Sequence, residues 1–337
     1  MDTVKHEDII RKIPPLAPRG GKGDTTTERR DCVHRYSKVH QGSVNCLAPS
    51  QQKHTVVTAG GDGNATIFNY STGKVQAYMR HDGKAVTALE NAPLINGVVT
   101  GCRDTNVRLW NGTTATLFPG HSLVVTAVVI TPDNTRILSG SRDNCINAWD
   151  IKTGKLLYSI AESRNLITAM KLIPNENILV QTSEDKRVRL WDTRNLQLIH
   201  VYPTKHYIQT CCDVDSTGNC IVTGSNGFNG SGCEVSLWDV RSKKLLGDLR
   251  GNEQGVNCVK FLSNSSGNVV ISGSKDSLVK LWDISKRECI LEKRLPGMGC
   301  ITDLISYPDG SVMCSTMNGC VLLTLDDRNM ITETVCF

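Results

Sequence analysis

Short runs of alternating apolar and polar residues, each only a strand in length, follow one another along this chain with glycine-rich turns between them. The clearest unit begins at His121, and its predicted strands lie at 125–128, 136–139, 146–149 and 156–160. Alternation with a period of two between glycine turns is typical of β-strands in a sheet with both faces buried. The pattern therefore predicts one four-stranded sheet in this unit.

The same unit recurs along the whole chain. Its third strand ends in Trp-Asp or Trp-Asn at five places, and the template extends to two further positions: Trp110, Trp149, Trp191, Trp238, Trp282, Phe68 and Thr324. Successive positions are separated by 42, 39, 42, 47, 44 and 42 residues. A repeat of this length with a Trp-Asp signature is typical of the WD repeat, in which each repeat forms one propeller blade. We therefore predict an all-β fold, a seven-bladed WD-repeat β-propeller closed by strands from the chain termini.

The propeller is expected to occupy residues 32–337, which leaves residues 1–31 as a flexible N-terminal arm. The arm contains three prolines and many charged residues, with too little apolar surface to fold by itself. Strand-like sequence occurs at Cys32–Lys38 and at Met330–Phe337. The sequence leaves open which of these takes the outer position of the last blade, and whether both add to it.

Composition limits the classes of partner. The net charge is only +5, aromatic residues make up 5%, and the basic residues are scattered, so no nucleic-acid partner is expected. Apolar runs are too short for direct membrane insertion, and the first residues lack the apolar core of a signal peptide, so a cytoplasmic location is expected. The cysteines include no Cys-X2-Cys pair that could begin a metal site, and neither a metal nor a cofactor is expected.

A small residue recurs near the start of six first strands. The position is always alanine or cysteine: Cys46, Ala88, Ala127, Ala169, Cys211 and Cys258. Because free cysteine behaves as a small hydrophobic residue, we expect a small buried site near the crowded propeller axis.

Polar residues also recur, and they predict hydrogen-bonded sets within single blades. The three sets are His40, Thr58 and Asp62 with Phe68 in place of Trp; His81, Thr100, Asp104 and Trp110; and His121, Ser139, Asp143 and Trp149. Each hydroxyl is expected to link the Trp N–H to the His, and each His to the Asp, because buried polar groups need partners. A catalytic Ser-His-Asp triad is unique in its fold and needs an oxyanion hole, so repetition favours a structural role. The chain is not expected to be an enzyme.

The fifth repeat departs most from the others, because one turn expands to Ser225–Gly232 and carries Phe228. This turn belongs to the propeller face that also carries the connections between blades, here called the top face. We predict that a protein or peptide binds the top face of blades three to five. The predicted contact residues are Leu123, Val124, Arg142, Arg164, Leu166, Glu184, Tyr207, Ile208 and Phe228. Two alternatives stay open: Phe228 plugs the central channel, or the apolar side chains point into the core.

A second surface is defined by two Trp-Asp-X-Arg boxes. They resemble the boxes with which substrate receptors dock on the propeller adaptor of cullin ubiquitin ligases. The residues are Trp191, Asp192, Arg194, Trp238, Asp239 and Arg241. The alternative is that each Arg pairs with the Asp two residues before it.

From about residue 36 onward the chain resembles the WD repeat-containing protein 31 family. The resemblance is carried by His121–Thr126, Ser139–Asn144, Gln181–Lys186 and Ser225–Phe228 with Gly232–Glu234. It implies a non-enzymatic propeller of the cilium or ciliary base that regulates trafficking complexes and regulators of small GTPases. We expect the chain to be a monomer within a larger complex. Members begin Met-Gly where this chain begins Met1-Asp2, so the resemblance does not extend to a lipid anchor on the arm.

Overall fold

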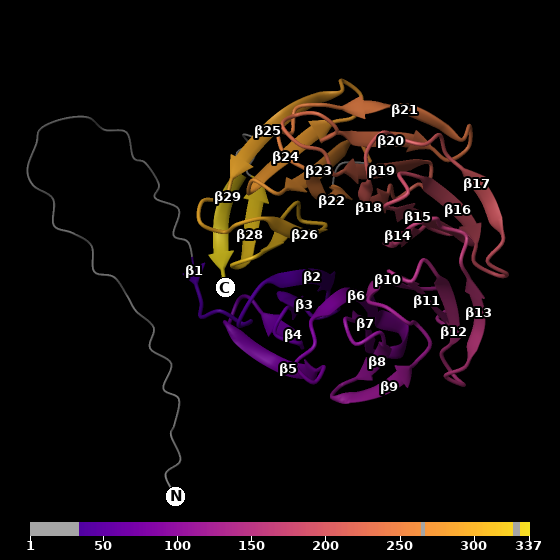
Figure 1. Ribbon diagram of the computed structural model, residues 1–337. Helices are drawn as coiled ribbons and strands as arrows, with labels where there is room; N and C mark the ends of the chain where they lie inside the picture. Colours follow the sequence, from indigo (N-terminus) through magenta and orange to yellow (C-terminus); the bar gives the residue numbers. More distant parts are fainter. Residues whose placement is uncertain (1–33, 264–266, 326–330) are drawn as a thin grey trace, which may run out of the picture. The chain divides into compact units, whose positions relative to one another are not determined.

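The computed structural model describes residues 34–263, 267–325 and 331–337. These residues form seven β-sheets arranged as blades around a central axis (Figure 1). The all-β, seven-bladed propeller predicted from the repeat is confirmed. The predicted flexible arm, residues 1–31, lies outside the described residues.

The first three blades follow the chain from the inner strand to the outer strand. Blade one consists of β2 (Val44–Pro49), β3 (Thr55–Gly60), β4 (Asn64–Asn69) and β5 (Lys74–Arg80). Blade two consists of β6 (Val86–Ala92), the short 3-10 helix η1 (Pro93–Ile95), β7 (Gly97–Cys102), β8 (Val107–Asn111) and β9 (Thr114–Phe118). Blade three consists of β10 (Val125–Ile130), β11 (Arg136–Ser141), β12 (Ile146–Asp150) and β13 (Leu156–Ile160).

The remaining blades repeat this order. Blade four consists of β14 (Ile167–Leu172), β15 (Ile178–Ser183), β16 (Val188–Asp192) and β17 (Leu198–Val201). Blade five consists of β18 (Gln209–Val214), β19 (Cys220–Ser225), β20 (Val235–Asp239) and β21 (Lys244–Leu249). Blade six consists of β22 (Val256–Phe261), β23 (Val269–Ser274), β24 (Leu278–Asp283) and β25 (Glu288–Arg294). Blade seven consists of β26 (Ile301–Ser306), β27 (Val312–Thr316), β28 (Gly319–Leu325), β29 (Ile331–Cys336) and β1 (His34–Arg35).

Both ends of the chain contribute to the last blade. The C-terminal strand β29 is its fourth strand, and β1 pairs in parallel outside β29. The Tyr36 N–H extends this pairing by donating to the Cys336 carbonyl at 2.9 Å. Phe68, which replaces the repeat Trp in blade one, stacks on Phe337 with ring centroids 4.1 Å apart. Blades one and seven are therefore joined by the Phe68–Phe337 contact and by the chain that runs from β1 in blade seven to β2 in blade one.

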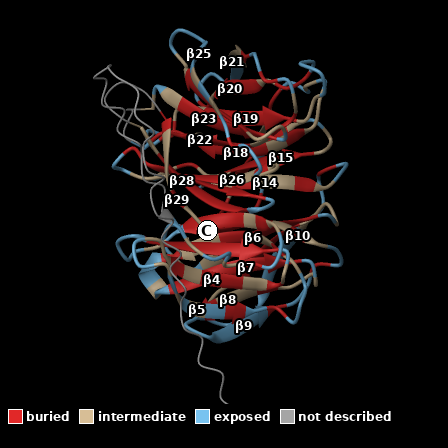
Figure 2. Ribbon diagram, turned by 90° about the vertical axis from the view of Figure 1, so that its left-hand side faces the viewer, coloured by how far each residue is buried: buried red, intermediate tan, exposed pale blue. Residues whose placement is uncertain are grey.

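The core follows from the position of each strand. The inner strands pack against those of the neighbouring blades around the ring, and the third strands of blades three to six are almost wholly buried. The outer strands β9 and β13 are largely exposed, and Figure 2 shows the buried interior beside exposed outer strands and loops. The small position of the inner strands is buried as predicted, except that Ala169 is partly exposed. Blade seven carries Asp303 at this position.

A ring of hydrogen bonds that the sequence reasoning did not predict joins all seven inner strands. In every blade, the second residue of the inner strand is Thr or Asn, and its side chain donates to the first carbonyl of the next inner strand at 2.5–2.8 Å. The pairs are Asn45–Val86, Thr87–Val125, Thr126–Ile167, Thr168–Gln209, Thr210–Val256, Asn257–Ile301 and Thr302–Val44. The last pair closes the ring from blade seven to blade one. Each bond gives the carbonyl at the start of an inner strand a partner from the neighbouring blade.

Candidate functional site

The predicted polar set of blade three is complete. His121 Nδ1 lies 2.9 Å from Asp143, and His121 Nε2 lies 2.7 Å from the Ser139 hydroxyl. The Trp149 indole N–H donates to the same hydroxyl at 2.8 Å. Burial lowers the pKa of His121, and Asp143 opposes this shift. The set links two loops and two strands of one blade into a single buried network.

Blade one forms the same network without a tryptophan. His40 Nδ1 lies 3.0 Å from Asp62, and its Nε2 lies 2.8 Å from Thr58. Phe68 has no N–H to offer, and the Thr66 hydroxyl takes the free place on Thr58 at 2.8 Å. The prediction for His40, Thr58 and Asp62 is confirmed.

In blade two the predicted set is wrong in one member. His81 and Trp110 both bond the Thr100 hydroxyl, at 2.8 and 2.9 Å. Asp104, however, pairs with Arg108 four residues later, through both carboxylate oxygens. An arginine offers two parallel donors to a carboxylate, so it outcompetes a single imidazole N–H. Nδ1 of His81 is left without a hydrogen-bond partner among the described residues, and burial together with Arg108 lowers the pKa of His81 to about 4.

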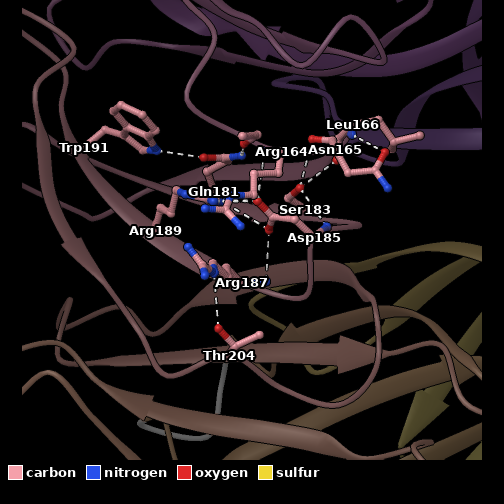
Figure 3. A network of polar contacts seen from close by, with 11 residues as sticks. Arg164, Asn165, Leu166, Gln181, Ser183, Asp185, Arg187, Arg189, Trp191 and Thr204 are labelled. Carbon is pink, nitrogen blue, oxygen red and sulfur yellow. Dashed lines mark hydrogen bonds and ion pairs between the residues drawn. The ribbon is translucent and has the colours of Figure 1, made fainter.

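Blade four carries the same arginine substitution with a further replacement (Figure 3). The Trp191 N–H donates to Gln181 Oε1 at 2.8 Å, and the Gln181 amide donates to Ser163 at 2.5 Å. Asp185 pairs with Arg189, whose side chain is only 2% exposed. The longer Gln181 side chain therefore replaces the missing hydroxyl, and Ser163 stands where blades one to three have His.

The burial of these networks excludes a nucleophilic role for Ser139. The residue is 0% exposed, and its hydroxyl already bonds both His121 and Trp149, so no substrate can approach it. Throughout the described residues, no group of three or more His, Cys, Asp or Glu side chains is arranged to hold a metal ion. Each polar set stabilises its own blade by linking strands and loops of that blade.

The central channel contains a second charged network that sequence reasoning missed. A cavity of about 380 Å³ is lined by all seven inner strands, and five charged side chains lie on its wall: Glu90, Lys171, Asp213, Lys260 and Asp303. Asp213 accepts the N–H of Phe261, and Asp303 accepts the N–H of Leu47, each at 2.9 Å across a blade interface. Comparing the fifth residue of each inner strand would have revealed four of these five charges.

The charges of the channel stabilise one another. Burial raises the pKa of Asp303, and Lys260 opposes this shift. For Lys260 itself, burial alone lowers the pKa, but Asp213, at 3.8 Å, and Asp303 reverse the shift and raise it. Because both carboxylates also satisfy backbone N–H groups of a neighbouring blade, the network has a structural explanation.

The predicted binding residues lie on the top face, and none of them is buried. Leu123 and Phe228 are 50% and 68% exposed. Arg142 and Arg164 are exposed, and five members are half-buried: Val124, Leu166, Glu184, Tyr207 and Ile208. The alternative in which the apolar side chains point into the core is excluded for Leu123 and Phe228.

The loop that carries Phe228 has a defined conformation. Phe228 and Ser231 exchange backbone hydrogen bonds at 2.9 and 3.1 Å around a tight turn, with Asn229 and Gly230 at positive φ. The Gly230 N–H donates to the Glu253 carbonyl of the next connection at 2.8 Å, and the Tyr207 and Ser231 hydroxyls lie 2.8 Å apart. An Asn-Gly pair is favoured where both turn residues need positive φ. The loop is thus fixed at both sides, and the aromatic ring projects into solvent.

The Trp-Asp-X-Arg boxes lie at the ends of β16 and β20 and in the turns that follow these strands. Trp191 and Trp238 are 2% and 0% exposed and belong to the core. Arg194 is exposed and pairs with Asp192 at 2.6 Å, which is the alternative expected for such a box. Arg241 is also exposed, while Asp239 accepts the N–H of Ser242. An adaptor could contact only the two arginines and the edges of the two carboxylates.

The described part of the chain contains no helix of the length and apolar character needed to cross a membrane. Every cysteine within the described ranges is a free thiol.

Comparison with known proteins agrees with this architecture. Residues 30–69, 73–111, 112–150, 154–192 and 243–283 match the family described as WD domain, G-beta repeat. Periodic tryptophan protein 2 of Saccharomyces cerevisiae is 34% identical over 221 residues, which are 64% of this chain and 23% of that protein. Nuclear distribution protein nudF 1 of Talaromyces marneffei is 28% identical over 280 residues, 75% of this chain and 60% of its own length. Small ribosomal subunit protein RACK1y of Oryza sativa subsp. japonica is 22% identical over 201 residues, 57% and 45% of the two chains.

This chain spans less than two thirds of the length of each of these relatives. The repeat match itself covers more than half of the chain and includes four of its five tryptophans of the Trp-Asp type. The chain therefore belongs to the WD-repeat family of β-propellers, whose members generally serve as protein-interaction scaffolds.

Proposed function

We propose that this chain is a non-catalytic interaction scaffold whose protein partner docks on the top face of blades three to five. One observation carries the proposal: Phe228 is 68% exposed on a loop that is held by hydrogen bonds to blade six. An exposed aromatic residue on a rigid support loses little conformational entropy when a partner covers it. Leu123 lies on the same face and is half exposed.

The proposed setting is cytoplasmic, at the cilium or ciliary base. The resemblance of residues 121–126 and 225–234 to WD repeat-containing protein 31 supports this setting, because both segments lie on the proposed docking face. The scaffold would then act on ciliary trafficking complexes as a monomer within a larger assembly.

The test compares two double variants by affinity capture and mass spectrometry from ciliated cells. Phe228→Ala with Leu123→Asp changes the docking face at its two most exposed apolar residues. Leu94→Asp with Ile290→Ala is the matched control, because these residues are 75% and 44% exposed on other surfaces. Thermal melting of all proteins comes first, so that loss of fold is not taken for loss of contact.

We expect ciliary trafficking proteins to be lost from the docking-face variant and retained by the control. Retention of every partner by both variants would contradict the proposal. Capture of a cullin adaptor that disappears with Arg194→Ala and Arg241→Ala would support the ubiquitin-ligase receptor instead.

A further inference from the structure

We propose that the partner segment is an extended acidic peptide, with acidic side chains against blades two and three and a bulky apolar side chain against blades four and five. The inference rests on the proposed function and adds the chemistry of the partner. It comes from the distribution of charge around the top opening of the channel.

One backbone hydrogen bond recurs in all seven blades and defines that opening. In each blade the N–H of the residue before the turn acid, or its equivalent, donates to the carbonyl of a connection residue at 2.8–3.1 Å. The pairs are Gly61–Ser43, Arg103–Ala85, Arg142–Val124, Glu184–Leu166, Asn226–Ile208, Lys275–Gly255 and Met317–Cys300. We call the donors and acceptors of these bonds, together with the residue that precedes each acceptor in the sequence, the mouth.

The mouth is basic on one side. Its cations are Lys84, Arg103, Arg142 and Lys275, and its one anion is Glu184, which gives a net charge of +3 (four minus one). All four cations are exposed, and none has an ion-pair partner among the described residues. Only Lys275 is hydrogen-bonded through its side chain, to Asn226 at 2.7 Å. Three free cations therefore gather on the neighbouring blades two and three.

Among the described residues, the turn acids of blades two and three form no ion pair with these cations. Asp104 is paired with Arg108, and Asp143 is bonded to His121, so both carboxylates are already engaged within their blades. Charge-assisted bonds of this kind hold an acid in place and leave the exposed arginines free to bind another anion.

Apolar residues continue the mouth where the cations end. Leu123 is in blade three, Leu166 in blade four, and Tyr207 and Phe228 in blade five. A ligand that crosses the mouth from blade two to blade five meets positive charge first and apolar surface second. This order matches an acidic run followed by an aromatic or large aliphatic residue.

The wider face favours a narrow ligand over an extended polyanionic surface. Asp82, Glu162 and Glu253 are exposed on the connections outside the mouth, interspersed with the exposed Arg164 and Arg250. A nucleic acid or an anionic membrane would lie against these carboxylates as well as against the cations, and like charges repel it. A peptide of strand width contacts the mouth alone.

The experiment is a selection from a displayed library of random peptides on the purified full chain. The charge-reversal variant is Arg103→Glu with Arg142→Glu. The matched control is Lys152→Glu with Lys155→Glu, which reverses two exposed charges in the hairpin between β12 and β13, at the opposite end of the blade. Phe228→Ala is selected in parallel.

We expect the wild type and the Lys152/Lys155 control to enrich peptides that combine Asp and Glu with an aromatic residue. The charge-reversal variant should enrich Lys and Arg instead, and it should bind synthetic copies of the wild-type peptides about tenfold more weakly or worse. Enrichment of the same acidic peptides by the charge-reversal variant, enrichment of peptides without acidic residues, or no enrichment by the wild type would overturn the inference.

The Phe228→Ala selection distinguishes a failure of the acidic-peptide inference from a failure of the proposed docking face. Peptides that lose affinity on Phe228→Ala but lack acidic residues would leave the docking face standing and remove only the acidic chemistry. Acidic peptides whose affinity is indifferent to Phe228→Ala would remove the docking face of blades three to five. Fluorescence anisotropy with single-stranded DNA and sedimentation with phosphatidylserine vesicles complete the test, because tighter binding of either than of the peptides, lost on charge reversal, would assign the mouth to that class.

Discussion

Blades two and three each contain a His, a hydroxyl residue, an Asp and a Trp at equivalent positions, yet only blade three connects all four. His121 reaches Asp143 in blade three, whereas His81 has no carboxylate partner in blade two. The difference is one side chain, because Arg108 takes Asp104. A repeat motif thus predicts which residues meet only if the residues that compete for them are also considered.

The same competition occurs in blade four, where Arg189 takes Asp185. In both blades the arginine stands four residues after the acid, on the third strand and two residues before the repeat Trp. Blade three has Asn147 at this position, and its acid remains with the histidine.

The largest expected difference between the two blades concerns removal of the histidine. His121→Ala leaves Asp143 and Ser139 each short of one bond, so we expect a loss of about 3 kcal/mol in the free energy of unfolding. His81→Ala breaks a single hydrogen bond and should cost about 1 kcal/mol less. Urea denaturation of both variants measures the difference, and equal losses would contradict the account of blade two.

Lowering the pH should reduce the free energy of unfolding through His81, the unpaired histidine of blade two. The folded-state pKa of His81 is about 4, below its ordinary value of 6.5, so folding favours the neutral ring. This contribution is complete above pH 6.5 and is lost as the pH falls towards 4, with a size of about 3 kcal/mol. His81→Gln should flatten the stability profile in that window. A wild-type profile that is already flat there would be inconsistent with a neutral, buried His81.

Removing Arg108 should give blade two the complete hydrogen-bonded set that blade three has. Arg108→Met frees Asp104, which can then accept from His81, and the pKa of His81 should rise towards 6.5. The unfolding free energy should change by no more than about 1 kcal/mol in either direction, because a His81–Asp104 pair replaces the Asp104–Arg108 pair. NMR titration of the imidazole protons reports the pKa. Arg189→Met is the control, since blade four has Ser163 in place of the histidine and should leave His81 unchanged.

The ring of Thr and Asn side chains allows a finer comparison of two blade interfaces. Thr302→Val and Thr126→Val each remove an inter-blade bond, and each should cost about 1 kcal/mol. At the blade seven to blade one interface the chain enters the next inner strand from β1, which has only two residues, whereas at the other interfaces it comes from a longer outer strand. Hydrogen exchange should therefore increase further in β2 and β26 with Thr302→Val than in β10 and β14 with Thr126→Val. The opposite order would show that the strand β1 and the Phe68–Phe337 contact dominate the closure.

The sequence predicted the repeat number, the blade order and two of the three polar sets, because these depend on spacing within one blade. It did not predict the partner of Asp104, since an Arg four residues later looks like an ordinary surface residue. The inter-blade ring was also missed, although Thr126 and its equivalents form a visible column, because its bonds link residues about one repeat apart. Only the structure could show that Phe228 projects outward, because that depends on the contacts of its loop with blade six.

We propose that the repeated polar residues hold the fold while the divergent top face binds a partner. Partner capture and urea denaturation of His121→Ala and Phe228→Ala, performed side by side, test it most directly. Phe228→Ala should leave the unfolding free energy within about 0.5 kcal/mol of the wild type and lose the captured partner. His121→Ala should lower stability and, while still folded, retain the partner. A Phe228→Ala protein that keeps every partner, or a folded His121→Ala protein that loses the same partner, would contradict the claim.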